Sequence, residues 1–168
     1  MNVTQKSNET ALFSSGFGVH DDVCLRELSL DGSFDLLGQL VRANKGKKLY
    51  TATKIPPKNF KWPARPEYSL DDCYPPDHIE EYVEKSLKNA GLSSFDLMQL
   101  HTWEDSWLED DRGIKKMIYL KEQGMFHAIG LSLNRWEPWN GVKAVRSGLI
   151  DSLDAFVVHG MPAVPAAG

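Results

Sequence analysis

The sequence predicts an α/β protein in which parallel strands alternate with helices. Two short apolar runs lead to this prediction, residues 96–101, which end in His101, and residues 128–134, which end in Ser132 and Asn134. About one helix's length of chain separates the runs, as in a βαβ unit with a buried parallel sheet. Because chemistry in such folds lies at the carboxyl ends of the strands, we expect the three polar residues to share one rim.

Length and composition are those of one ordinary soluble globular domain. The chain has 168 residues, of which 42% are hydrophobic and 25% are charged, and its net charge is -4. This charge gives no electrostatic case for binding nucleic acid, and no apolar run approaches the roughly 18 residues of a membrane span. The start of the chain lacks a signal-peptide core. Cys24 and Cys73 fit no metal spacing, and we expect free thiols in the cytoplasm.

The first predicted elements lie before residue 55. Residues 1–33 are poorly patterned, and we expect them to be loosely held apart from a short strand at 23–25. A helix follows, because four apolar residues share one helical face: Leu36, Leu37, Leu40 and Val41. The β-branched and aromatic residues 49–53 predict a strand that ends in Lys54.

Six prolines lie in residues 55–76, so we expect a long loop without regular helix or central strand. Its aromatic residues either form a pocket wall or pack the loop: Trp62, Tyr68 and Tyr74. Asp77 has the position of a helix N-cap, with Glu80 three residues later as in a capping box. The helix keeps an apolar face until Gly91 ends it, and the strand to His101 follows.

The second half of the chain repeats this alternation. The expected elements are a helix at 112–123, a strand at 126–131, a helix that starts near Pro138 and carries Trp139, Val142 and Val145, and a last strand at 150–158. The crossovers between successive strands should be right-handed. Residues 159–168 lack periodicity and should be irregular.

Four segments of the chain resemble the aldo/keto reductase family. They are Leu36-Leu37-Gly38-Gln39-Leu40, Tyr50-Thr51-Ala52-Thr53-Lys54, Asp96-Leu97-Met98-Gln99-Leu100-His101 and Ile129-Gly130-Leu131-Ser132-Leu133-Asn134. The resemblance implies a (β/α)8 barrel that reduces aldehydes and ketones with NADPH, or sometimes NADH. Such a barrel typically needs about 250 residues. The expected fold is therefore an incomplete (β/α)8 barrel over residues 34–158, with 1–33 as an amino-terminal segment and 159–168 as a tail.

The resemblance also implies roles for single residues. Lys54 and His101 match the catalytic lysine and histidine of the family, and Ser132 and Asn134 match the pair that hydrogen-bonds the nicotinamide carboxamide. In that chemistry a tyrosine protonates the alkoxide left by hydride transfer, helped by an ammonium that lowers its pKa. The histidine donates to the carbonyl oxygen. Four tryptophans either line a substrate mouth or pack the rim: Trp103, Trp107, Trp136 and Trp139.

Before Leu36 the chain departs from the family pattern. The family's catalytic aspartate and tyrosine should lie there, but no tyrosine precedes Tyr50. Tyr50 is a poor substitute, because roughly 13 Å of strand separates it from Lys54. Tyr68 and Tyr74 lie in the loop nearer the rim and match no motif.

The resemblance also fades after about residue 152, where the family usually has a glutamine near Asp154. Both ends look replaced, as if the gene were truncated or read out of frame. Two functions stay open. The first is NADPH-dependent reduction of a small carbonyl substrate, with weak cofactor binding and with activity lost if the tyrosine and aspartate are missing. The second is a non-catalytic truncated barrel that self-associates through open strand edges. Neither involves a metal, nucleic acid or a membrane.

Overall fold

The computed structural model describes residues 12–13, 23–26, 33–133 and 139–154. The strands are β1 (Leu12–Phe13), β2 (Val23–Arg26), β3 (Leu49–Ile55), β4 (Phe95–Leu100), β5 (Phe126–Ser132) and β6 (Ser152–Asp154). The helices are α1 (Ser33–Ala43), α2 (Leu70–Cys73), α3 (Pro76–Ala90), α4 (Arg112–Glu122) and α5 (Val142–Arg146), with a 3₁₀ turn η1 (Asp105–Leu108). None of the helices in these ranges has the length and apolar content needed to cross a lipid bilayer.

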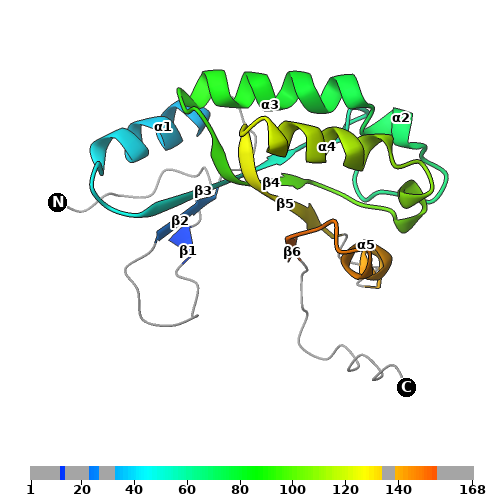
Figure 1. Ribbon diagram of the computed structural model, residues 1–168. Helices are drawn as coiled ribbons and strands as arrows, with labels where there is room; N and C mark the ends of the chain where they lie inside the picture. Colours follow the sequence, from blue (N-terminus) through cyan, green and yellow to red (C-terminus); the bar gives the residue numbers. More distant parts are fainter. Residues whose placement is uncertain (1–11, 14–22, 27–32, 134–138, 155–168) are drawn as a thin grey trace.

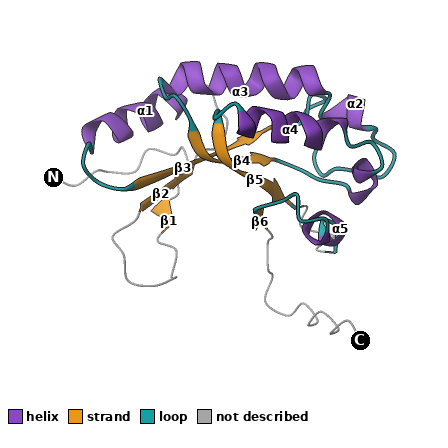
Figure 2. Cartoon of the chain, viewed as in Figure 1, coloured by secondary structure: helices purple, strands orange, loops and turns teal. Residues whose placement is uncertain are grey.

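The strands form one sheet in the order β1-β2-β3-β4-β5-β6. β1 and β2 are antiparallel, and every later neighbouring pair is parallel. Helices α1, α3 and α4 lie together over one face of the sheet, as Figures 1 and 2 show. The prediction of an α/β protein with parallel strands and alternating helices is confirmed, and so is the short strand at 23–25.

The hydrophobic core lies between the sheet and these helices. Its fully buried members include Met98 and Leu100 of β4, Ile129 and Leu131 of β5, Ile79 and Val83 of α3, and Met117 and Leu120 of α4. Each such side chain contributes about 1.5–3 kcal/mol on burial, so the core fixes the sheet against its helix layer.

Alternation along the strands places the remaining residues on the opposite face, which we call the inner face. In β4 and β5, Gln99, Gly130 and Ser132 alternate with the core residues and so lie on the inner face. The register pairs Lys54 with Gln99 and Gln99 with Gly130, which puts Lys54 of β3 on that face as well. Lys54, Gln99 and Ser132 therefore lie on the face away from the helices.

The start of α3 differs from the prediction. Its N-cap is Pro75, without a side-chain hydrogen bond, so the capping box expected from Asp77 and Glu80 is wrong. Pro76 lacks an amide hydrogen and already has the helical φ angle, so the helix starts with one amide fewer to satisfy and without a capping box. Glu80 instead accepts a hydrogen bond from Lys116 of α4 at 2.8 Å. The predicted end is confirmed, because Gly91 caps α3 with φ +62°.

The proline-rich loop contains a short helix that the prolines were expected to exclude. In α2, Ser69 Oγ accepts from the Asp72 amide at 3.2 Å, and the Ser69 amide donates to Asp72 Oδ2 at 2.9 Å. This capping box forms in the proline-free stretch between Pro66 and Pro75, where every amide can donate. The prediction that residues 55–76 contain no helix was wrong, because it relied on the number of prolines in the whole loop and not on their positions.

The last helix begins later than predicted. α5 begins at Val142, after Gly141 in the left-handed region with φ +102°, and Trp139 precedes the helix instead of belonging to it. β6 begins at Ser152, within the stretch 150–158 that was expected to form a strand. The described part of the chain does not include Trp136, Pro138, residues 155–168 or most of residues 1–33.

Candidate active site at the carboxyl ends of the strands

Three polar side chains meet on the inner face, at the carboxyl ends of β3, β5 and β6. Lys54 Nζ donates to Ser132 Oγ at 2.8 Å and to Asp154 Oδ2 at 3.0 Å. Lys54 and Ser132 are 6% and 8% exposed. The structure thus joins two residues that the sequence singled out separately, and it adds Asp154 to them. Asn134 lies outside the described residues.

Lys54 reaches this position by crossing β4. The register aligns Lys54 with Gln99 and Gln99 with Gly130, so Ser132 lies two residues further toward the carboxyl end of β5. Gly130 is needed here, because a Cβ at this position would lie 2.7 Å from Gln99 Cγ. Since a side chain on β5 would push Gln99 toward its neighbour in register, the glycine keeps the path of the lysine clear.

His101 follows β4 directly and stands at the same end of the sheet. Its amide donates to the Ile55 carbonyl at 3.0 Å, which ties the end of β4 to the end of β3. Its ring meets Trp62 edge-on, with ring centroids 5.4 Å apart. The structure therefore places His101, Lys54 and Ser132 on one rim, and it places an aromatic ring beside the imidazole.

Trp62 and its aromatic neighbour Phe60 are exposed to solvent. Phe60 is 66% exposed and Trp62 is 47% exposed, and their ring centroids lie 6.3 Å apart. Trp103 and Trp107 are buried at 0% and 3% exposed, so the expectation that they pack the rim is confirmed over the alternative that they line a substrate mouth. The exposed apolar surface at the rim comes from the proline-rich loop instead.

Tyr74 is a structural residue of the rim. Its hydroxyl donates to the Ile55 carbonyl at 3.4 Å and accepts from the Thr102 amide at 3.0 Å. Complete burial raises the pKa of the Tyr74 phenol well above its usual range, because the phenolate would be desolvated. A general acid in a reductase needs the opposite shift.

The remaining tyrosines lie elsewhere. Tyr50 is in the first half of β3, at the opposite end from Lys54, Tyr82 and Tyr119 belong to α3 and α4, and the Tyr68 ring lies under the Lys61 ammonium at 5.5 Å.

The inner face offers groups suited to an amide. The Ser132 hydroxyl accepts from Lys54, and a hydroxyl that accepts can still donate its proton. Gln99, at 1% exposed, adds a side-chain amide on the same face. Hydroxyl and amide groups are of the kind that can pair with a carboxamide. Within the described ranges, no three His, Cys, Asp or Glu side chains gather in a way that could hold a metal ion.

Comparison with known protein families matches residues 31–153 to the aldo/keto reductase family, as the four motifs predicted. No curated protein matches the sequence. A glycerol dehydrogenase from Gluconobacter oxydans has a similar structure, with a TM-score of 0.51 and 22% identity over 73% of this chain and 36% of that one. A thermostable aldo-keto reductase, solved with the inhibitor epalrestat, is also similar. Its TM-score is 0.46 and its sequence identity is 19%, over 60% of this chain and 31% of that one. The chain spans about a third of the length of these structures, and the first likeness shows part of the same fold.

Proposed function

The chain belongs to the aldo/keto reductase family, and we propose that it reduces a small carbonyl compound with NADPH, or NADH, at the carboxyl ends of β3, β4 and β5. The observation that supports this most is the buried 2.8 Å hydrogen bond from Lys54 to Ser132. It joins the residue matched to the catalytic lysine with the residue matched to nicotinamide binding. The bound cofactor supplies the hydride, and the side chains of this chain orient the reactants and supply the proton.

In this proposal Ser132 donates to the carboxamide and orients the ring. His101 donates to the substrate carbonyl oxygen, and the Lys54 ammonium stabilises the negative charge that grows on that oxygen. Hydride transfer to the carbonyl carbon leaves an alkoxide that takes one proton. Because Tyr74 is buried and bound to the backbone, the proton comes here from His101, which regains it from solvent.

The substrate of this proposal carries an apolar or aromatic substituent next to its aldehyde. Trp62 lies beside His101 and Phe60 lies beside Trp62, and the two side chains are 47% and 66% exposed. A planar substituent that packs on these rings buries apolar surface and gains edge-to-face or stacking contacts of about 0.5–1.5 kcal/mol. The carbonyl then lies close to the imidazole.

The test is NADPH oxidation by the purified chain with benzaldehyde as substrate. His101→Gln should lower kcat by about 100-fold or more, because it removes the acid that acts in the transition state. His127→Gln is the matched control, since His127 is exposed on β5 and should leave the rate unchanged. A folded wild-type chain without turnover, or a His101 variant with the wild-type rate, would contradict the proposal.

A second candidate is a non-catalytic partial barrel that self-associates. The observation that favours it is a group of exposed apolar side chains beside β6, the last strand of the described sheet: Trp139, Val145, Leu149 and Leu153 at 46%, 47%, 40% and 39%. A strand edge with apolar neighbours favours pairing with a second copy. Sedimentation velocity should then show a dimer that Leu153→Lys converts to monomer, and a monomeric wild-type chain would exclude it.

A further inference from the structure

The strongest unassigned feature of the rim is the ion pair between Lys54 and Asp154, which are 100 positions apart in the sequence. Their Nζ and Oδ2 atoms lie 3.0 Å apart, and the side chains are 7% and 35% exposed. An ammonium with so little access to water needs a compensating negative charge. The Asp154 carboxylate supplies that charge, whereas the Ser132 hydroxyl is a neutral acceptor.

We propose that Asp154 is the positioning residue of the rim, which holds the Lys54 ammonium over Ser132. The family resemblance places the partner aspartate before Leu36 and a glutamine near Asp154. In this chain the acid comes from β6, on the far side of β5. The inference rests on the proposed function in one respect, that Lys54 and Ser132 belong to the active site.

Two contacts from one ammonium fix its position. Lysine is a point charge on a flexible stem, so a neutral and a charged acceptor together hold the Nζ atom more firmly than the neutral acceptor does. Acceptors on β5 and β6 hold it from two strands at 2.8 and 3.0 Å. The β5–β6 register supports this geometry, because it pairs Ser132 directly with Asp154, and the Leu133 amide donates to the Asp154 carbonyl at 2.8 Å. The carboxylate therefore has a fixed place beside the serine.

The pair has a consequence for the oxidation state of the cofactor that binds here. The ring of NADP⁺ carries a positive charge that the ring of NADPH lacks. The Asp154 carboxylate offsets part of the positive charge beside Ser132. Its removal makes that region more positive by one unit, which disfavours the oxidised ring. Asp154→Asn should therefore raise the ratio of the NADP⁺ and NADPH dissociation constants by about threefold to tenfold.

The direct test uses protein without cofactor. The protein is treated with an amine-reactive reagent, and peptide mass spectrometry measures the rate at which each lysine is modified. Asp154→Asn should speed the modification of Lys54 at least fivefold, because the released ammonium loses its proton and leaves its site more readily. Asp154→Glu keeps the negative charge and should stay slow. Glu80→Gln, which removes the carboxylate bound to Lys116, should leave Lys54 unchanged and serves as the matched control.

The outcomes separate the two proposals. An unchanged Lys54 rate in a folded Asp154→Asn variant, or equal acceleration in Asp154→Asn and Asp154→Glu, would overturn the role of Asp154, because a loosened strand and a lost charge then have the same effect. Wild-type protein with a slow Lys54 that binds neither NADPH nor NADP⁺ would refute the proposed function and leave the positioning role standing. A raised NADP⁺/NADPH ratio, together with faster Lys54 modification, supports both.

Discussion

At the scale of single residues, the stability of the rim depends on a buried charge. Lys54→Met leaves the Asp154 carboxylate without its ammonium, so we expect the free energy of unfolding to fall by about 1–3 kcal/mol, less than for a fully buried pair because the carboxylate is 35% exposed. Urea unfolding of the variant and the wild type measures this difference in the free energy of unfolding. Lys121→Met is the control: that ammonium pairs with Asp151 at 2.7 Å, but both are more than a third exposed, and the loss should be below about 0.5 kcal/mol.

Tyr74 gives a second prediction at this scale. Tyr74→Phe removes a hydroxyl that bridges the Ile55 carbonyl and the Thr102 amide, so unfolding should become easier by about 1–2 kcal/mol. NADPH binding should not change, because the phenol has a structural role. Tyr119→Phe, at a ring 48% exposed, should alter stability by less than about 0.5 kcal/mol. Lost turnover in a stable Tyr74→Phe protein would contradict this and make Tyr74 the proton donor.

The sequence predicted some of the rim residues and missed others, for a physical reason. Lys54, His101 and Ser132 each end a strand, so a local pattern marks them. Asp154 could not be chosen in this way, because its importance comes from its contact with Lys54, which is distant in the chain. Trp62 was named for a pocket wall or for loop packing, but its contact with His101 depends on the fold and could not be predicted.

At the scale of elements, the contact between α1 and α3 depends on Gly38. A Cβ at this position would lie 1.9 Å from the Ala90 carbonyl oxygen, which belongs to the backbone and cannot move aside. Gly38→Ala should lower the free energy of unfolding by about 2 kcal/mol, although alanine favours helix by about 1 kcal/mol. Leu36→Ala, at a position 46% exposed in the same helix, should stay within about 0.5 kcal/mol. A stabilised Gly38→Ala protein would show that the helices do not pack here.

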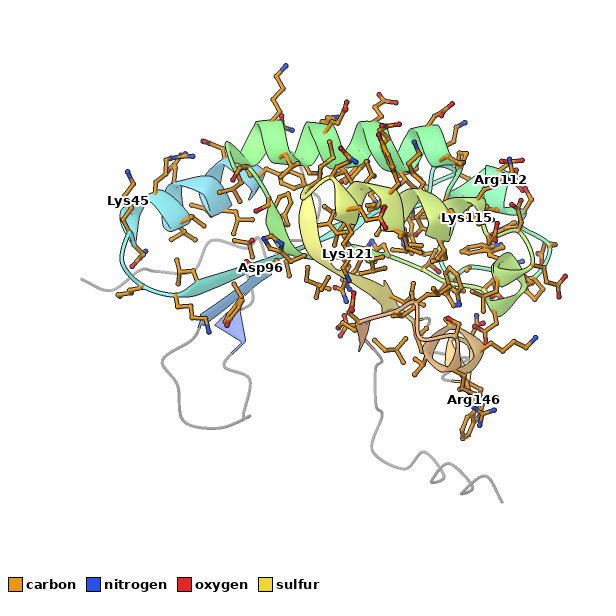
Figure 3. All side chains as sticks on the ribbon, in the orientation of Figure 1. Lys45, Asp96, Arg112, Lys115, Lys121 and Arg146 are labelled. Atoms are coloured by element: carbon orange, nitrogen blue, oxygen red, sulfur yellow. The ribbon has the colours of Figure 1, made fainter. Side chains whose placement is uncertain are left out.

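The β5–β6 connection gives a prediction about pH. The pKa of Asp151 is lowered, first by the Ile129 amide, which donates to its carboxylate at 2.8 Å, and then by Lys121. Figure 3 labels Lys121 near the end of α4, beside the strands. Because the folded pKa lies below the unfolded value of about 3.9, the stabilisation is present above pH 4 and is lost as pH falls through the folded pKa.

The measurement compares Asp151→Asn with wild type by urea unfolding across pH. The variant should be less stable at pH 7, and the difference should shrink as pH falls below about 4. A difference that stays constant down to pH 2 would show that the carboxylate charge is not responsible.

The elements were predictable to the extent that their signals are local. The positions of α3, α4, β4 and β5 were predicted correctly from apolar periodicity and short apolar runs. An element that buries one face needs apolar residues at a regular spacing, which is visible in the sequence. The start of α5 was misplaced, because the pattern counted Trp139 as apolar and buried, whereas the chain reaches helical geometry only after Gly141.

At the scale of the whole molecule, helices α1, α3 and α4 cover one face of the sheet (Figures 1 and 2), and Lys54, Gln99 and Ser132 lie on the other face. This arrangement follows from the parallel βαβ units, in which the carboxyl ends of all strands meet at one rim. The rim is where Lys54, His101 and Ser132 lie. The α/β fold class was predictable because each motif lies at the end of a strand. The extent of the sheet was not predictable, because strand pairing at its edges depends on residues outside the motifs.

The measurement that tests the account most directly is a titration of the purified chain with NADPH, followed by nicotinamide fluorescence and accompanied by a circular dichroism spectrum. We expect saturable binding by the folded protein, weakened about fivefold to tenfold in Ser132→Ala, because a hydrogen bond of about 1–1.5 kcal/mol is lost. Ser94→Ala, which removes a hydroxyl at the amino-terminal end of β4, should bind as wild type does. A folded wild-type chain that binds no NADPH, or a Ser132→Ala protein that binds as tightly as wild type, would contradict the proposed active site.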